Sequence, residues 1–501
     1  MRIRLISGLK AGLFLFFVTT LQLGAQADWG PLLETEVFLE PTAERIRSPL
    51  AFDGQRYLVV WEQPEYDPGR LDYSVYGWFI DRSGNPVGDP FRIVTTPDID
   101  KNPAVAFNGD HYLVTWVDPL NSTINATVVT VTGSVLGDVV ISPLVPIPSG
   151  LVFDSLIRPA IASNGRDFLI VWNEGSGSTG DDRTDLTGCM VTIDPDGSVV
   201  LTVCDIPLGS PEGDYAPSVA FAKENFLVTW SSGSYRSDAW ELDILGRLVS
   251  SDGQTISDEI AITTEPRSQV DPTVSSDGTN FLVVWRDNQP GPDLLAARVS
   301  ESGVVLDGPP SGAMIISESG TSPQVAHNGQ NWLIVWRENV SPFAFIFGTQ
   351  VASDGSVLEP SGVPISVWSE DIPLFPAVAS DGENFLVTWS GSDLPTLRMQ
   401  LVGAIPPRIK PLRDRVVNLL EAGSLGKHGK QLTGALDRAE SHLAKGHLKP
   451  ALQQLEQFIR TVEQLADKGE IDLYDANELA AYARLIIYHR TRPEAVAEPV
   501  I

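Results

Sequence analysis

The sequence predicts an all-β seven-bladed propeller with four-stranded antiparallel blades, followed by a small all-α four-helix bundle. A phrase that ends in tryptophan recurs seven times, about every 55 residues. A fixed period in this range is typical of repeat architectures. Turn signals divide each copy into four short β-rich segments, which is the pattern of a propeller blade. After the last copy the apolar period changes from two to about 3.6 residues, which predicts helices.

The repeated phrase begins with Pro and ends in an apolar run closed by Trp, as in Pro272 to Trp285. Such β-branched and aromatic runs suit strands that are covered on both faces. We interpret the tryptophans as packing residues between blades, and the alternative is an exposed aromatic platform for a ligand. The seven tryptophans are Trp61, Trp116, Trp172, Trp230, Trp285, Trp336 and Trp389.

Between the first and second strands, six copies carry Asn-Gly or Asp-Gly, which favours two-residue hairpin turns with positive φ at both residues. The fourth copy has Ala222-Lys223 there, so we expect a different turn. The six pairs are Asp53-Gly54, Asn108-Gly109, Asn164-Gly165, Asp277-Gly278, Asn328-Gly329 and Asp381-Gly382.

The ends of the repeat region predict a closed ring. The last copy stops after its third strand, because Pro406-Pro407 follows. An additional strand, at about residues 33–39, precedes the first copy. We expect this N-terminal strand to complete the seventh blade.

The N-terminus has the pattern of a secretory signal peptide: basic residues, an apolar run and Ala25-Gln-Ala27 as a cleavage site. We therefore expect a mature chain that is secreted, extracellular or periplasmic, with no transmembrane segment. The predicted division is 1–27 signal peptide, 28–404 propeller, 405–411 Pro-rich linker, 412–490 helical bundle and 491–501 disordered tail.

The chain is acidic, with 64 Asp and Glu against 35 Lys and Arg and a formal net charge of −29. Contacts to phosphate and sulfate need Lys and Arg, so this charge argues against nucleic acid and polyanionic glycans. Neutral sugars, cations and basic proteins remain compatible partners.

The two cysteines, Cys189 and Cys204, lie on either side of Asp196-Gly197. A two-residue turn there would place them directly opposite each other, and an oxidising compartment would then favour a disulfide. The alternative is two small buried thiols. A different turn length would put the two residues out of register.

An acidic residue stands two positions after the tryptophan in four copies: Asp118, Glu174, Asp287 and Glu338. In equivalent blades these carboxylates lie at matching places on one face, where they could bind a ligand or calcium. The alternative, which we favour, is that each accepts backbone N–H groups in its own turn. Ser232 and Gly391 occupy this place in two other copies, so the ring is incomplete.

The C-terminal block resembles the FIMAH-type helical domain of secreted bacterial proteins. Three segments carry the resemblance: Leu432-Thr-Gly-Ala-Leu436, Leu443-Ala-Lys-Gly446 and Leu452-Gln-Gln-Leu-Glu-Gln-Phe-Ile459. It implies an extracellular accessory module without known chemistry. The seven repeats resemble propeller repeats of secreted bacterial proteins.

No catalytic residues stand out. The sequence has no His-Glu-x-x-His motif and no paired CxxC, so no zinc site is indicated. We expect a monomeric, non-catalytic binding protein whose propeller rim recognises an extracellular glycan or protein. We expect no cofactor, and calcium is the alternative left open. The alternatives are a carbohydrate-active enzyme that uses rim carboxylates, and a structural matrix or envelope component.

Overall fold

The structure is a computed structural model. It describes residues 30–31, 35–38, 47–67, 70–94, 101–143, 157–175, 184–209, 213–236, 239–266, 268–288, 293–308, 312–340, 343–360, 362–366, 372–391, 396–403 and 423–471. Short stretches around the last block are also described: 412–413, 416–417, 419–420, 476, 479–480, 483 and 487. The predicted signal peptide (1–27), linker (405–411) and C-terminal tail (491–501) lie outside these residues.

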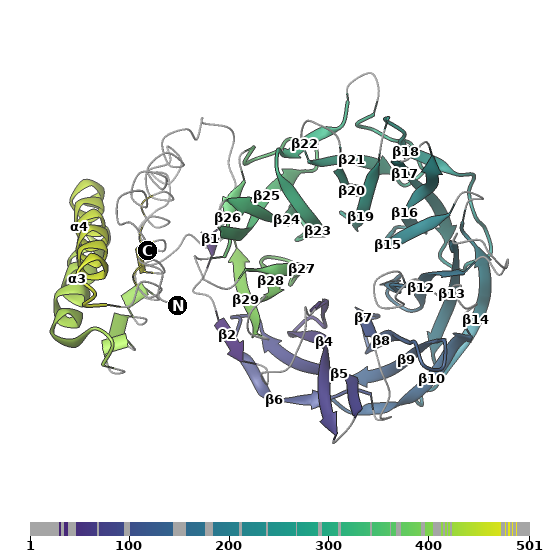
Figure 1. Cartoon of the computed structure of the whole chain (residues 1–501), viewed down its shortest axis with the longest axis horizontal. Coiled ribbons are helices and arrows are strands. Elements are labelled where there is room, and N and C mark those ends of the chain that lie inside the picture. Colours follow the sequence, from purple (N-terminus) through teal and green to yellow (C-terminus); the bar gives the residue numbers. More distant parts are fainter. Residues whose placement is uncertain are drawn as a thin grey trace.

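Seven antiparallel sheets form a ring, with the first strand of each sheet nearest the centre and the strands following one another outwards (Figure 1). Blade 1 contains β3 (Leu50–Phe52), β4 (Arg56–Asp67), β5 (Arg70–Asp81) and β6 (Pro86–Arg92). Blade 2 contains β7 (Lys101–Phe107), β8 (His111–Asp118), β9 (Thr123–Thr130) and β10 (Val135–Pro143). Blade 3 contains β11 (Ala160–Ser163), β12 (Phe168–Gly175), β13 (Thr184–Ile193) and β14 (Val199–Pro207).

The remaining blades repeat this order. Blade 4 contains β15 (Asp214–Ala222), β16 (Asn225–Arg236), β17 (Ala239–Ser250) and β18 (Ile260–Thr263). Blade 5 contains β19 (Gln269–Ser276), β20 (Asn280–Asp287), β21 (Leu294–Ser300) and β22 (Met314–Ser317). Blade 6 contains β23 (Gly320–His327), β24 (Asn331–Val340), β25 (Phe343–Ala352) and β26 (Val363–Pro364). The seven-bladed, four-stranded architecture expected from the repeats is confirmed.

Blade 7 is built from both ends of the repeat region. It contains β27 (Leu374–Ser380), β28 (Phe385–Ser390) and β29 (Thr396–Gly403). Two N-terminal strands, β1 (Gly30–Pro31) and β2 (Thr35–Phe38), pair with β29. The expected N-terminal strand therefore closes the ring, and closure leaves no unpaired blade at the seam.

The seven repeated tryptophans lie on the second strand of each blade, and none exposes more than 1 % of its surface. They pack between neighbouring blades. Trp285 lies in a cluster with Leu227 of β16, and Trp336 lies in a cluster with Leu282 and Val284 of β20. The described rings are buried, so they provide core packing and no exposed aromatic platform.

The predicted two-residue turns are wrong in length. Phe52 pairs with Tyr57, so the turn holds four residues, and only its Gly54 has positive φ. The Asp53 carboxylate accepts the N–H groups of Gln55 and Arg56, which closes the turn through the side chain. In blade 4, Ala222 pairs with Asn225 around a true two-residue turn, so the expected difference is present.

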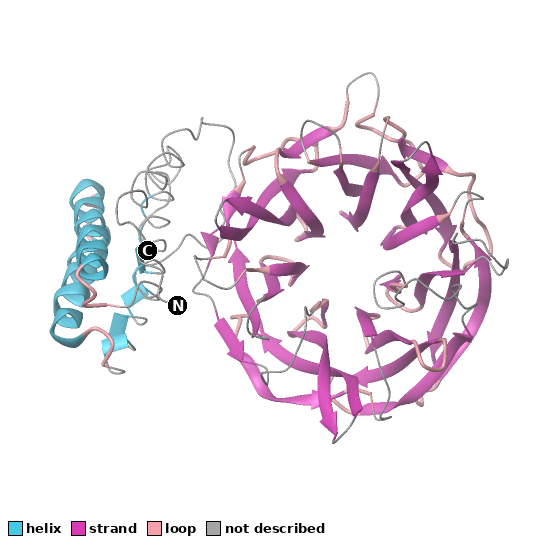
Figure 2. Cartoon of the chain, in the orientation of Figure 1, coloured by secondary structure: helices cyan, strands magenta, loops and turns pink. Residues whose placement is uncertain are grey.

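The C-terminal block contains η2 (Gly426–His428), α3 (Gly429–Ala444) and α4 (Leu448–Asp467), drawn as helices beside the ring in Figure 2. The two long helices match the second and third helices expected from the sequence. For the first and fourth, the structure describes only helical residues between 412 and 420 and between 476 and 487. Their apolar residues, including Leu412, Val416 and Leu479, join the core of α3 and α4. The described residues thus make up two long helices with further helical residues packed on them, and do not by themselves form a complete four-helix bundle. No described helix is long and apolar enough to cross a membrane.

Candidate functional site

The centre of the ring holds a cavity of about 270 Å³. Its lining comes from the start of the innermost strand of every blade, where each repeat carries its proline. The residue before this proline is therefore presented to the ring axis in blades 2 to 7. In blade 1 the matching residue is Arg47, which lies three residues before Leu50. Leu50 pairs with Val59 in blade 1 at the same place as Val105 pairs with Val114 in blade 2, and the blade 2 channel residue also lies three residues before Val105.

We call these seven residues the channel positions. All seven line the cavity, and they differ in chemistry although the backbone around them repeats. In blade order they are Arg47, Asn102, Arg158, Ala216, Asp271, Ser322 and Phe375.

Backbone geometry directs these side chains to the axis. Five channel positions have φ between 48° and 54°, in the left-handed region that non-glycine residues seldom adopt. Each costs on the order of 1–3 kcal/mol. A β-bulge accompanies them: in blade 2, one extra residue of β7 lies between the pairs Lys101–Val117 and Ala104–Thr115. Bulges of this kind re-aim a side chain. The five residues are Asn102, Ala216, Asp271, Ser322 and Phe375.

Residues one position after the repeated tryptophans bind the backbone at two of the channel positions. Glu62 accepts the backbone N–H of Asn102 at 3.1 Å, across the junction of blades 1 and 2. Asn173 accepts the backbone N–H of Arg158 at 3.4 Å within blade 3. The Asn102 side chain donates to the carbonyl of Ile157 at 3.0 Å and ties blade 2 to blade 3.

The cavity contains two arginines and one carboxylate among its channel positions. The Arg158 guanidinium lies 3.9 Å from the Asp271 carboxylate, across the opening from blade 3 to blade 5. This separation gives an ion pair without a direct hydrogen bond. Arg158 Nε is buried without a hydrogen-bond partner among the described residues. The Arg47 guanidinium covers the ring of Phe375, 4.7 Å from its centroid.

Burial acts on both arginines, and the charge of Arg158 acts in addition on Arg47. Burial, followed by the charge of Arg158, lowers the pKa of Arg47 to about 10, against the smaller opposing effects of Asp271 and Glu62. Burial also lowers the pKa of Arg158, although Asp271 opposes the shift. Desolvation and a nearby like charge both disfavour a cation, so the site holds positive charge that the protein does not fully compensate.

The acidic residues expected to form a ligand site lie on the second strands, at the rim where the channel positions open. Asp118 is 4 % exposed and accepts the N–H groups of Leu120 and Asn121 in its own turn. Glu338 accepts the indole N–H of Trp336 at 2.8 Å and the hydroxyl of Ser319 at 2.9 Å. These contacts are structural.

The other two acids lie at the matching places. Glu174 stands near the end of β12 and is half-buried, and Asp287 ends β20 and is buried. Within the described part of the chain, no group of three or more His, Cys, Asp or Glu side chains is placed to hold a metal ion. The four acids are thus not brought together as one cluster there.

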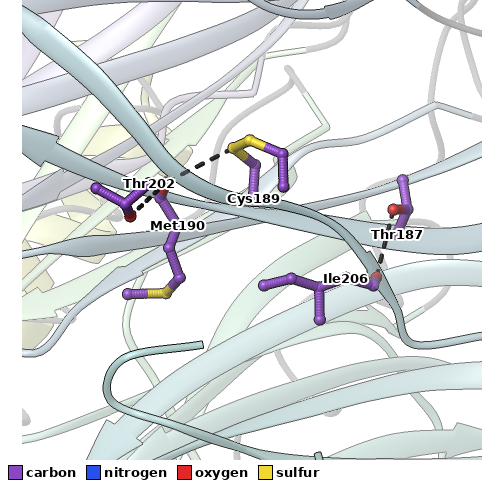
Figure 3. Close-up of a disulfide and its surroundings, with 6 residues drawn as sticks. Thr187, Cys189, Met190, Thr202 and Ile206 are labelled. Carbon is purple, nitrogen blue, oxygen red and sulfur yellow. Dashed lines mark hydrogen bonds between the residues drawn. A yellow bond between two sulfur atoms is a disulfide. The ribbon is translucent and has the colours of Figure 1, made fainter. Parts of the chain in front are cut away.

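Cys189 and Cys204 form a disulfide between β13 and β14 (Figure 3). The turn is longer than expected, because Ile193 pairs with Val199. An extra residue on β14 lies between the partners of Met190 and Val191 and shifts the register by one. That residue is Thr202, whose hydroxyl donates to the carbonyl of Met190 at 3.1 Å. The bulge thus offsets the longer turn and returns the cysteines to opposite places.

Residues 411–488 match the FIMAH domain family. The match covers the helical block, so the resemblance seen in the sequence is confirmed for this part of the chain. No curated protein matches the chain in sequence.

Several solved structures match this chain at low similarity. An α-L-arabinofuranosidase from Podospora anserina is 10% identical, with a TM-score of 0.29, over 52% of this chain and 93% of that one. The Swd1 β-propeller domain from Myceliophteria thermophila is 9% identical, with a TM-score of 0.41, over 74% and 99%. Trypanosoma rangeli sialidase is 9% identical, with a TM-score of 0.37, over 79% and 63%. These likenesses carry no activity over to this chain.

The channel positions were not among the residues singled out from the sequence. Their signal was nevertheless present, because every repeat was recognised by its proline. The residue before that proline varies from Arg to Asp to Phe between copies. Variation at one fixed place in an otherwise regular repeat is the pattern of a binding surface on a rigid scaffold.

Proposed function

We propose that this chain is a secreted, non-catalytic binding protein whose propeller recognises an extracellular glycan at the central cavity. The observation that carries the proposal is the set of channel positions, which places two arginines, a carboxylate and several neutral residues around one opening. Small-ligand sites are concave and contain a few converging polar groups. The FIMAH block serves in this proposal as a helical docking module, folded as a small bundle.

The cavity gains its chemistry at a cost to the fold. Five strained backbones and two partly desolvated arginines do not improve packing. Strain and unbalanced charge of this kind cluster at functional sites. Asp118 and Glu338 instead satisfy groups of their own blades, so we place ligand recognition at the axis and not at the ring of acids.

A glycan panel tests the proposal. The processed chain, beginning near Asp28, is applied with calcium and then with a chelator. Specific binding without turnover is the expected result, and binding that survives the chelator agrees with recognition by channel residues. Loss of the bound glycan through cleavage would favour the carbohydrate-active enzyme. Failure to bind any glycan would contradict the proposal and favour a protein partner or a structural role.

A further inference from the structure

We infer that the central cavity binds the carboxylate of a single acidic sugar, of the hexuronic acid class, between the guanidinium groups of Arg47 and Arg158. This inference rests on the proposed function and names the ligand class of the same site. The argument has three parts: unused donors, charge balance and size.

The first part concerns donors. Arg158 reaches Asp271 only at 3.9 Å, and its Nε is buried without a hydrogen bond among the described residues. Arg47 lines the same cavity and contacts Phe375 through the face of its guanidinium, not through its N–H edge. Guanidinium edges match carboxylates in a bidentate geometry. A bound carboxylate would give the Arg158 Nε–H an acceptor and would pair with the charge of Arg47.

The second part concerns charge. The channel positions carry two positive charges and one negative charge, and the whole chain carries −29. One ligand carboxylate would bring the site to neutrality and relieve the repulsion between the arginines. A polyanion would give the occupied site a net negative charge, and the acidic propeller around the site would repel it. The site therefore selects a monoanion.

The third part concerns size and hydroxyl groups. A cavity of about 270 Å³ lies just below the range of pockets for drug-sized ligands, which suits one sugar residue. The Asp271 side chain is 46% exposed and can accept ligand hydroxyls, and the neighbouring blade offers the hydroxyl of Ser322. A carboxylic acid with hydroxyl groups can therefore bind the arginines through its carboxylate and Asp271 through its hydroxyls.

Calorimetric titration of the processed chain with D-glucuronate, D-glucose, acetate and sulfate tests the ligand class. We expect glucuronate to bind more tightly than each of the other three. Equal binding of glucose and glucuronate, or tighter binding of sulfate, would overturn the inference. A neutral oligosaccharide that ends in glucuronate, compared with the free sugar acid, shows whether the source is a glycan end or a free monosaccharide.

Substitutions locate the site. Arg158→Gln and Arg47→Gln should each weaken glucuronate binding about 10- to 100-fold, the loss expected for charge-assisted hydrogen bonds. The control is Arg166→Gln, because the Arg166 side chain is 84% exposed and is not among the residues that line the cavity. It should bind as the parent chain does. Equal loss in the control, or none in the two cavity variants, would contradict the assignment.

Asp271→Asn separates the two halves of the site. It removes the charge that competes for Arg158, so acetate should bind several-fold more tightly. It also removes an acceptor for hydroxyls, so the preference for glucuronate over acetate should fall. An unchanged preference would count against the sugar. Tight binding of a neutral glycan that is insensitive to Arg158→Gln would sink this inference and leave the proposed function standing, whereas no glycan binding would sink both.

Discussion

The propeller contains two rings of seven equivalent residues, which differ in residue identity, burial and backbone geometry. The tryptophan ring has one identity in all blades, is buried to 1% exposure or less, and lies between the sheets. The channel positions have seven places but six residue types, line a cavity, and include five strained backbones. Repetition of one residue marks what the fold needs for packing. Variation on a repeated backbone marks what is free to serve binding.

The largest effect should come from the tryptophan ring. Trp285→Ala removes a side chain buried between blades 4 and 5 and should lower the free energy of unfolding by about 3–5 kcal/mol. Urea unfolding followed by far-UV circular dichroism measures it. Asp271→Asn in the same blade is the comparison and should cost no more than about 1 kcal/mol, because its ion pair with Arg158 is partly exposed. An equal loss of unfolding free energy in both variants would contradict the division into a packing ring and a binding ring.

The disulfide should matter next. Replacing Cys189 and Cys204 together by Ala opens a link across 15 residues of blade 3, which also carries Arg158. A loss of about 3 kcal/mol is expected from the loop length. Thermal unfolding with and without reductant measures it, and the parent chain should move towards the variant only when reduced. Weakened glucuronate binding by the folded variant would show that the link shapes the cavity as well.

A smaller loss is expected for Asp118→Ala. This carboxylate closes its own turn, so the change should cost about 1–2 kcal/mol because two N–H groups lose their acceptor. Ligand affinity should stay the same, with calcium or chelator present. A calcium-dependent drop in affinity would restore the ring of acids as the binding site.

The smallest effect has the opposite sign. Ala216 has φ of 51°, so Ala216→Gly should stabilise the fold by about 0.5–1 kcal/mol, since glycine adopts this conformation without strain. Ala104→Gly in β7 is the matched control and should destabilise by a similar amount. Chemical denaturation of both variants gives the comparison. Destabilisation by both would mean that the bulge is not strained.

The sequence was sufficient for the blades because their signals are local and repeated. Apolar runs, turns and period locate strands, and the missing fourth strand after residue 401 predicts closure by the N-terminus. Turn length was not predictable from Asp-Gly alone, because the Asp53 carboxylate stabilises a four-residue turn. The cysteine pairing likewise depended on a bulge at Thr202 that no composition signal reveals.

The candidate site was less predictable for a different reason. It combines residues from seven repeats, and the Arg158–Asp271 contact joins blades 3 and 5 across the axis. The acids after the tryptophans gave a regular pattern, but Glu338 serves Trp336 and Asp118 serves its turn. A pattern along the chain identified equivalent places, and only the closed ring showed which of them face a common cavity.

The central claim is that the arginines at the axis serve binding at the expense of the fold. Folding lowers the pKa of Arg47 well below the ordinary value of a guanidinium, to about 10, so the folded chain disfavours its charged form. The resulting cost is fully present below about pH 10 and is lost as the pH rises above 10 towards the ordinary pKa of a guanidinium. At pH 7, removing the two arginine charges should therefore raise the free energy of unfolding.

The most direct test is the unfolding midpoint in urea of the double variant Arg47→Gln, Arg158→Gln at pH 7 without ligand. We expect a higher midpoint than that of the parent chain, with an unchanged dependence on urea and with glucuronate binding lost. A lower midpoint would show that the two arginines support the ring, and the account of the channel positions as a binding site would be contradicted.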